Sequence, residues 1–135
     1  FKNTRTLLQN QAMKKPPYKA KGFNGEWFYG NLVDAMRYGK VVPHIQFGEY
    51  AYASQRFYGA PIKKDTLCRN SFLKDAKGKD AFYKDTLSHP ELGRGTVEYN
   101  SLSASFGLRF NNEPEFMLIS MYMLKQCTIT GNEFD

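Results

Sequence analysis

Few side chains in this 135-residue chain can act as a nucleophile or base, since it has two cysteines and two histidines. Cys68 would need a neighbouring base such as His44 or His89, because the thiolate is the attacking form. Neither histidine lies in an HExxH motif or in a Cys/His pattern with metal-ligand spacing. His89 precedes Pro90, and a solvated loop histidine is the simpler interpretation. The sequence therefore predicts no catalytic residue, no metal site and no cofactor.

Carboxylates in the central part of the chain are a second group that could do chemistry. Asp65, Asp75, Asp80 and Asp85 alternate with six lysines between residues 63 and 84. Paired carboxylates exchange protons or bind divalent cations. At this density of lysine, a solvated turn with surface ion pairs is the simpler interpretation. A small enzyme that uses these aspartates is the alternative.

A third group mixes basic and aromatic residues in the N-terminal part of the chain. Cations neutralise phosphates and exposed rings stack on unpaired bases, so the mixture is typical of nucleic-acid binding. The alternative is that the rings fill the core while the lysines are only solvated. The candidate binding residues are Lys14, Lys15, Lys19, Lys21, Trp27, Tyr29, Arg37 and Lys40.

The net charge of +6 is unevenly distributed. Residues 1–40 hold eight Lys and Arg against two acids, whereas residues 96–135 hold two against five. A basic end attracts phosphates or an acidic protein surface, although improved solubility is the simpler explanation. The longest apolar stretch, residues 116–124, is too short to span a membrane, so no membrane partner is expected.

A protein is the other partner that the sequence allows. Aromatic and arginine side chains are the usual anchors of protein interfaces. Tyr50, Tyr52, Arg56 and Tyr58 are the candidates for such a role. Association of several copies of the chain also stays open.

The length fits a single domain. Pro16 and Pro17 end any preceding helix, so we expect a basic N-terminal arm or short helix over residues 1–17 and one domain over residues 18–135. With two cysteines and no CxxC spacing, the chain fits a reducing cytoplasm. A disulfide between Cys68 and Cys127 stays open, because its geometry cannot be seen from sequence.

Aromatic residues make up 16% of the chain and favour strands. Residues 18–23 and 26–33 flank Asn24-Gly25, a pair that suits a type I′ turn, and are predicted to form a hairpin. Alternation over residues 44–54 predicts another strand or strand pair with tyrosines on one face.

Further strands are expected in the second half. The charged turn 74–79 joins strands over 67–73 and 81–87, and a second hairpin turns at residues 100–104. Residues 116–124 fit a strand or a short helix, and we favour a helix before a final strand over 126–130. These elements predict a mainly β fold, a partly open barrel or strongly bent sheet with one or two short helices.

Three short segments, in this order, resemble the YopX-like proteins of bacterial phages and prophages. The first extends from Tyr18 through the Asn24-Gly25 turn to Val33, and within it residues 27–32 match the family's W-x-Y-G-x-L. The second extends from Thr66 through residues 73–79 to Phe82 and Asp85. The third combines residues 95–99 and 106–108 with the closing 128–133. The chain departs from the family at residues 68–72, in place of G-Q-Y-T-G, and at residues 83–85, in place of E-G-D.

The resemblance implies a small, mainly β fold with an SH3-like or partly open barrel, and a gene carried by a phage or prophage. It implies no established enzyme activity. We therefore expect a non-catalytic accessory protein that binds nucleic acid or a host protein in the bacterial cytoplasm. The alternative is an anti-defence inhibitor that blocks a host nuclease such as a CRISPR effector.

Overall fold

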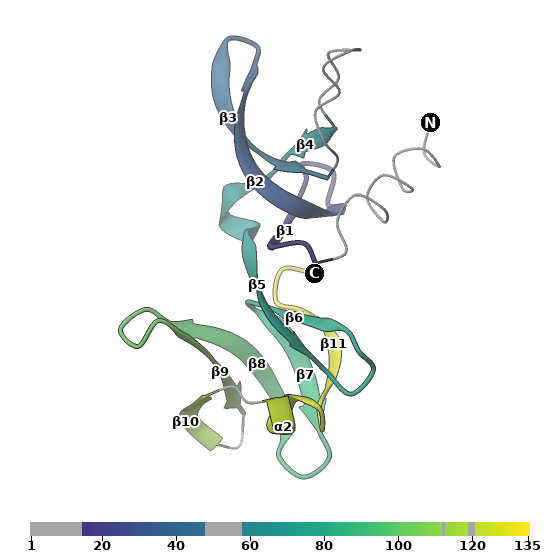
Figure 1. Ribbon diagram of the computed structural model, residues 1–135, viewed down its shortest axis with the longest axis vertical. Helices are drawn as coiled ribbons and strands as arrows, with labels where there is room; N and C mark the ends of the chain where they lie inside the picture. Colours follow the sequence, from purple (N-terminus) through teal and green to yellow (C-terminus); the bar gives the residue numbers. More distant parts are fainter. Residues whose placement is uncertain (1–14, 48–57, 112, 119–120) are drawn as a thin grey trace. The chain divides into compact units, whose positions relative to one another are not determined.

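The computed structural model describes residues 15–47, 58–111, 113–118 and 121–135. Within them the protein is mainly β, and its strands pair in antiparallel fashion (Figure 1). The chain divides into two compact units, Phe1–Arg69 and Asn70–Asp135, each of which is described by itself. A single domain over residues 18–135 therefore stays a prediction. Most of the predicted N-terminal arm, residues 1–14, lies outside the described residues.

The first unit is built around one long strand, β2. Strand β1 pairs with the first part of β2, and β3 pairs with its second part. The strand order is β4-β3-β2-β1-β5, and β5 continues into the second unit. The elements are β1 (Tyr18–Lys21), β2 (Trp27–Arg37), β3 (Lys40–Gln46), β4 (Gly59–Pro61), the short 3-10 helix η1 (Lys64–Thr66) and β5 (Cys68–Lys74).

The predicted hairpin around Asn24-Gly25 is confirmed by the pairing of β1 with β2. The predicted turn type is wrong, because Gly25 has a positive φ of 82° but Asn24 does not. The Gly25 N–H donates to the Gly22 carbonyl at 3.1 Å, and the Gly22 N–H donates to the Glu26 carbonyl at 2.8 Å. These bonds define a three-residue loop that ends in a glycine bulge.

Strands β2 and β3 form a long, curved hairpin (Figure 1). Arg37 pairs with Lys40, so the turn consists of Tyr38 and Gly39 alone. Both turn residues have a positive φ, of 51° and 76°, which is the geometry of a type I′ turn. The predicted strand over 44–54 begins within β3, and residues 48–57 lie outside the described part of the chain.

Cross-strand partners form the core of the first unit. Ala20 lies opposite Phe28, and Ile45 lies opposite Ala60. The rings of Phe28 and Phe47 stack with their centroids 5.8 Å apart. Burial of each large apolar side chain contributes roughly 1.5–3 kcal/mol relative to exposure. The buried cluster is Ala20, Phe28, Ile45, Phe47, Ala60 and Ile62, with Tyr18, Tyr58 and Leu67 packed against it.

The second unit contains a five-stranded sheet in the order β10-β9-β8-β7-β11. Beside it, the part of β5 from Asn70 onward forms a hairpin with β6. The elements are β6 (Asp80–Phe82), β7 (Asp85–His89), β8 (Gly93–Asn100), β9 (Ser105–Phe110), β10 (Glu113–Leu118), α2 (Met121–Leu124) and β11 (Thr128–Asn132).

The hairpins predicted in this half are confirmed, since β5 pairs with β6 and β8 pairs with β9. The strand predicted over 81–87 is interrupted, because Lys84 has a positive φ of 69° and separates β6 from β7. The apolar stretch 116–124 contains both predicted alternatives, the end of β10 and the helix α2. The predicted final strand is confirmed and extends to Asn132.

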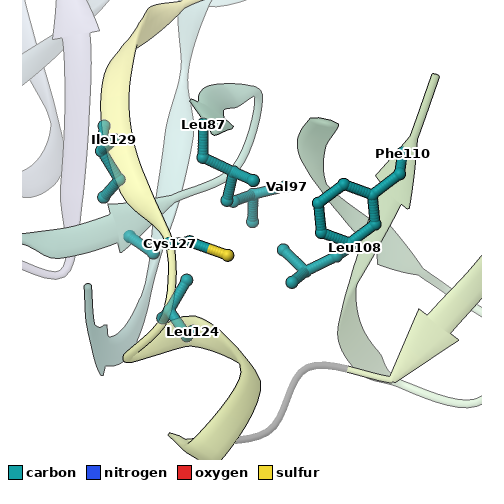
Figure 2. Packing of buried hydrophobic residues seen from close by; sticks show 8 residues of the cluster. Leu87, Val97, Leu108, Phe110, Leu124, Cys127 and Ile129 are labelled. Carbon is teal, nitrogen blue, oxygen red and sulfur yellow. The ribbon is translucent and has the colours of Figure 1, made fainter. Parts of the chain in front are cut away.

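Side chains from β7, β8, β9 and the C-terminal segment form the core of the second unit. Figure 2 shows Val97 and Leu108 beside Phe110, with the Cys127 sulfur pointing into the same cluster. Leu124 adds to it from α2, which explains how a helix of four residues is held in place. The buried cluster is Ala81, Leu87, Val97, Leu108, Phe110, Leu124, Cys127 and Ile129.

The predicted fold class, a small and mainly β fold with an open arrangement of strands and short helical segments, is confirmed. Over the described ranges, the strand order runs from one edge to another and closes no barrel. No helix in the part of the chain that the structure describes is long and apolar enough to cross a membrane.

Candidate functional site

A groove of about 570 Å³ opens on the first unit, and we call it the aromatic groove. It lies between the β1–β2 turn, the β2–β3 turn and strand β4. Its volume falls within the range of ligand-binding pockets. Its lining residues are Gly22, Phe23, Asn24, Phe28, Arg37, Tyr38, Lys40, Val42, Ala60 and Pro61.

Two exposed rings line the aromatic groove. Phe23 comes from the β1–β2 turn and is 66% exposed, and Tyr38 comes from the β2–β3 turn and is 92% exposed. Large apolar side chains seldom gather on a surface without a binding role. The two turns thus place two rings, 15 positions apart in sequence, along one groove.

Two cations accompany these rings. Arg37 and Lys40 are exposed cross-strand partners on either side of the β2–β3 turn. The Arg37 guanidinium carbon lies 5.4 Å from the centroid of the Tyr38 ring, within the range of a cation–π contact. Both cations were predicted as binding residues, and the structure brings them to the aromatic groove.

The burial pattern of β2 changes at Gly30, between Phe28 and Arg37. Phe28 and Gly30 are buried before this point, whereas Val33 and Ala35 are the less exposed residues after it. In a regular strand, alternate residues face opposite sides, so Phe28 and Arg37 would be on different faces. Both nevertheless line one groove, in agreement with the change in burial pattern.

The other predicted basic and aromatic residues form a separate cluster on β1 and β2. Lys19 lies opposite Tyr29, and Lys21 lies opposite Trp27. The Nζ atoms of Lys19 and Lys21 lie 4.7 and 5.5 Å from the centroid of the Trp27 ring. Lys19 is buried, with 5% of its surface exposed. None of these four residues lines the aromatic groove.

The remaining predicted binding residues lie elsewhere or outside the described residues. Lys15 is exposed ahead of β1, and Lys14 lies outside the described ranges. Tyr58, a predicted interface anchor, packs against the core of the first unit. The other predicted anchors, Tyr50, Tyr52 and Arg56, lie in the segment 48–57, which the structure does not describe.

The prediction that the central aspartates are solvated is wrong for Asp75. Asp75 is buried, and its Oδ1 accepts hydrogen bonds from the N–H groups of Lys77 and Lys79 at 2.9 and 2.8 Å. Its Oδ2 accepts a bond of 2.9 Å from the Ile129 N–H in β11. The carboxylate therefore shapes the β5–β6 turn and attaches the last strand to it.

The prediction is also wrong for Asp85, which is fully buried. Its Oδ2 accepts a hydrogen bond from the Phe82 N–H at 2.8 Å, and its Oδ1 accepts one from the Asn132 side-chain amide at 2.9 Å. Asp80 and Asp65 agree better with the prediction. Asp80 forms an ion pair of 2.8 Å with Lys74, and Asp65 is exposed.

The histidines are bonded within the fold. His89 was predicted as a solvated loop residue, but it is buried at the end of β7. Its Nδ1 accepts hydrogen bonds from the N–H groups of Glu91 and Leu92, so its Nε2–H donates to the Gln126 side chain at 2.9 Å. His44 is also buried, and its Nδ1–H donates to the Val42 carbonyl at 2.8 Å.

Both cysteines are buried, and neither forms a disulfide. The Cys68 Sγ donates to the Thr66 carbonyl at 3.3 Å. Burial, with a smaller contribution from the negative charge of Asp75, raises the pKa of Cys127 to about 11. A thiol with such a pKa is protonated at neutral pH and is a poor nucleophile.

The sequence did not single out the rings that line the aromatic groove. Phe23 and Tyr38 belong to the predicted mixture of basic and aromatic residues, but their exposure results from their positions in hairpin turns. Gly39 was the available signal for the second of these turns, because glycine readily takes a positive φ. In the described ranges, no three His, Cys, Asp or Glu residues are grouped so that they could hold a metal ion. The chain matches no model of a known protein family, and no curated protein matches it in sequence.

Proposed function

We propose that the chain is a non-catalytic accessory protein that binds nucleic acid through the aromatic groove of its first unit. The observation that carries this proposal is the groove itself, where Phe23 and Tyr38 lie beside Arg37 and Lys40. Cations neutralise backbone phosphates and release counterions, and aromatic rings provide faces for bases.

The division of charge between the units supports a polyanionic partner. Residues 1–69 contain twelve Lys and Arg against four Asp and Glu, whereas residues 70–135 contain seven against nine. The first unit therefore attracts phosphate groups from a distance, since summed charge acts beyond direct contacts. The positive charge belongs to the unit that also carries the groove.

The non-catalytic part of the proposal is supported by the bonding of the reactive groups. Asp75, Asp85 and His89 each bind groups of the fold in the second unit. Together with the resemblance to YopX-like proteins, this leads us to propose a phage or prophage protein that acts in the bacterial cytoplasm. The anti-defence alternative depended on Tyr50, Tyr52 and Arg56, outside the described residues, and it stays a prediction.

The test is a fluorescence anisotropy titration of labelled DNA and RNA with the full chain at two salt concentrations. We expect binding that weakens with salt, and a further loss in the double variant Arg37→Ala, Lys40→Ala. Two neutralised phosphates correspond to a decrease of about 1.4 to 1.8 in the slope of log affinity against log salt.

The matched control is the double variant Lys77→Ala, Lys79→Ala, which removes the same charge from an exposed turn of the second unit. We expect this control to retain most of the affinity. Equal losses in both variants would mean that net charge, and not the groove, determines binding. Absence of binding at low salt would refute the proposed function.

A further inference from the structure

Tyr38 has a backbone conformation that suits its residue type poorly. It occupies the first central position of the type I′ turn with a φ of 51°, next to Gly39 at 76°. This position favours Asn, Asp or Gly, and a bulky residue with positive φ is an outlier. The left-handed conformation costs a residue with a Cβ roughly 1–2 kcal/mol.

Burial of the ring does not offset this strain. Tyr38 is 92% exposed, so its ring gains little from packing within the described residues. Its neighbours are the Arg37 guanidinium and the space of the aromatic groove. Strained residues that the fold does not need are concentrated at functional sites. The strain at Tyr38, combined with its position in the lining of the aromatic groove, thus suggests that the exposed ring has a binding role.

We infer that the nucleic acid bound in the aromatic groove is single-stranded, with unpaired bases stacked on Tyr38 and Phe23. This inference rests on the proposed function and specifies its substrate class. Arg37 and Lys40, on either side of the turn, are placed to contact the phosphates next to a stacked base. In a duplex the faces of the bases are already stacked on each other, so exposed rings give less advantage there. Single strands offer free base faces without regard to sequence.

The variant Tyr38→Asn removes the aromatic ring but keeps a residue that suits the turn. Asn tolerates a positive φ better than Tyr does, so we expect the stability of the first unit to stay equal or rise. Trp27 is the sole tryptophan of the chain and lies in this unit, so its fluorescence reports unfolding there. For a labelled oligothymidylate of about 15 nucleotides, we expect about five- to a hundredfold weaker binding by this variant.

Phe72→Asn is the matched control. Phe72 is also an exposed aromatic residue with a positive φ, of 61°, but it lies in the second unit. We expect its replacement by Asn to leave the affinity for oligothymidylate unchanged. An equal loss in both variants would overturn the inference.

An abasic strand of the same length tests the stacking directly, because it keeps the phosphates and lacks the bases. We expect the wild-type chain to bind oligothymidylate more tightly than the abasic strand or a duplex, and Tyr38→Asn to remove most of this difference. Equal, salt-sensitive binding of all three probes would overturn this inference while leaving the proposed function intact. A loss of stability in Tyr38→Asn would overturn it too, by giving the ring a structural role. Binding of none of the probes would overturn both.

Discussion

In the first unit, the rings and cations of the aromatic groove are open to solvent, whereas in the second unit the chemically active side chains are turned inward. Arg37 and Tyr38 are exposed. Asp75, Asp85 and His89 are buried and hydrogen-bonded to other parts of the fold. Residue type alone did not distinguish these situations. Burial and bonding partners show that Arg37 and Tyr38 are accessible to a ligand, while Asp75, Asp85 and His89 bond within the second unit.

This comparison implies that changes in the two units have separable effects. Changes at the groove alter binding with little effect on stability, and changes at the buried carboxylates alter stability with little effect on binding. Trp27 fluorescence reports the first unit, and amide hydrogen exchange reports both.

Gly30→Ala gives the largest expected effect and tests whether the units respond separately. A Cβ at Gly30 would collide with the backbone carbonyl oxygen of Gln46 in β3. Backbone cannot move aside without disturbing the pairing of β2 with β3, so we expect the stability of the first unit to fall by about 3 kcal/mol. Chemical denaturation followed by Trp27 fluorescence measures it.

Gly25→Ala is the control for this variant, because no atom lies within 4 Å of its added Cβ. Because Gly25 has a φ of 82°, its replacement by Ala costs only the backbone strain of a positive φ, about 1–2 kcal/mol. If Gly30→Ala destabilised the second unit equally in hydrogen exchange, the two units would be one cooperative structure and the comparison would fail.

Asp85→Ala tests the structural role of the buried carboxylates. It leaves the Phe82 N–H and the Asn132 amide without their shared acceptor. We expect the second unit to lose about 2–3 kcal/mol, measured as faster exchange of amides in β6 and β11. Nucleic-acid binding at the groove should not change, and the exposed Asp65→Ala should have little effect on stability. A variant of intact stability that had lost an enzymatic activity would revive the interpretation of Asp85 as a catalytic residue.

The third prediction concerns alkaline pH. The folded pKa of Cys127, about 11, exceeds its ordinary value of 9.0, so the folded state holds the thiol proton more tightly than the unfolded state does. The resulting stabilisation is complete below pH 9 and is lost as pH rises from 9 through 11. We expect the second unit to lose about 1 kcal/mol at pH 10 from this group.

Cys127→Ala should reduce this dependence, and denaturation curves at pH 8, 9 and 10 provide the measurement. Lys84 is a second group that affects the pH dependence of stability, at higher pH. Burial lowers its pKa, but the charges of Tyr83 and Glu133 together raise it above its ordinary 10.5. Lys84 therefore stays charged over most of the range tested. If Cys127→Ala kept the full alkaline slope, another group would be responsible for it.

Local signals in the sequence predicted much of the fold. Asn24-Gly25 and the turn at 74–79 located two hairpins, because glycine and small polar residues favour tight turns. The type of the first turn was not predictable from the dipeptide alone, since Asn24 also fits a loop in which only Gly25 has a positive φ. The turn at Tyr38-Gly39 was missed because Tyr is rare in that conformation.

The candidate site was predicted less well than the fold. Arg37 and Lys40 were named from charge, but Lys19 and Trp27 were named by the same reasoning and lie in a separate cluster. A period of two cannot anticipate the change in burial pattern at Gly30. The role of Asp75 was missed because its partner is a backbone N–H 54 positions away. Almost every residue has a backbone N–H, so the sequence does not show which one binds the carboxylate.

The hydrogen bond between Asp75 and Ile129 can form only after both residues have been synthesised. Asp75 leaves the ribosome 54 residues before its partner, which at typical elongation rates is a delay of about 3 to 11 seconds. During this delay β7 lacks its neighbour β11, so the sheet of the second unit stays incomplete. The pairs among β1, β2, β3 and β4 need no residue beyond Pro61. The groove-bearing unit is therefore able to form on the nascent chain while the second unit is still being synthesised.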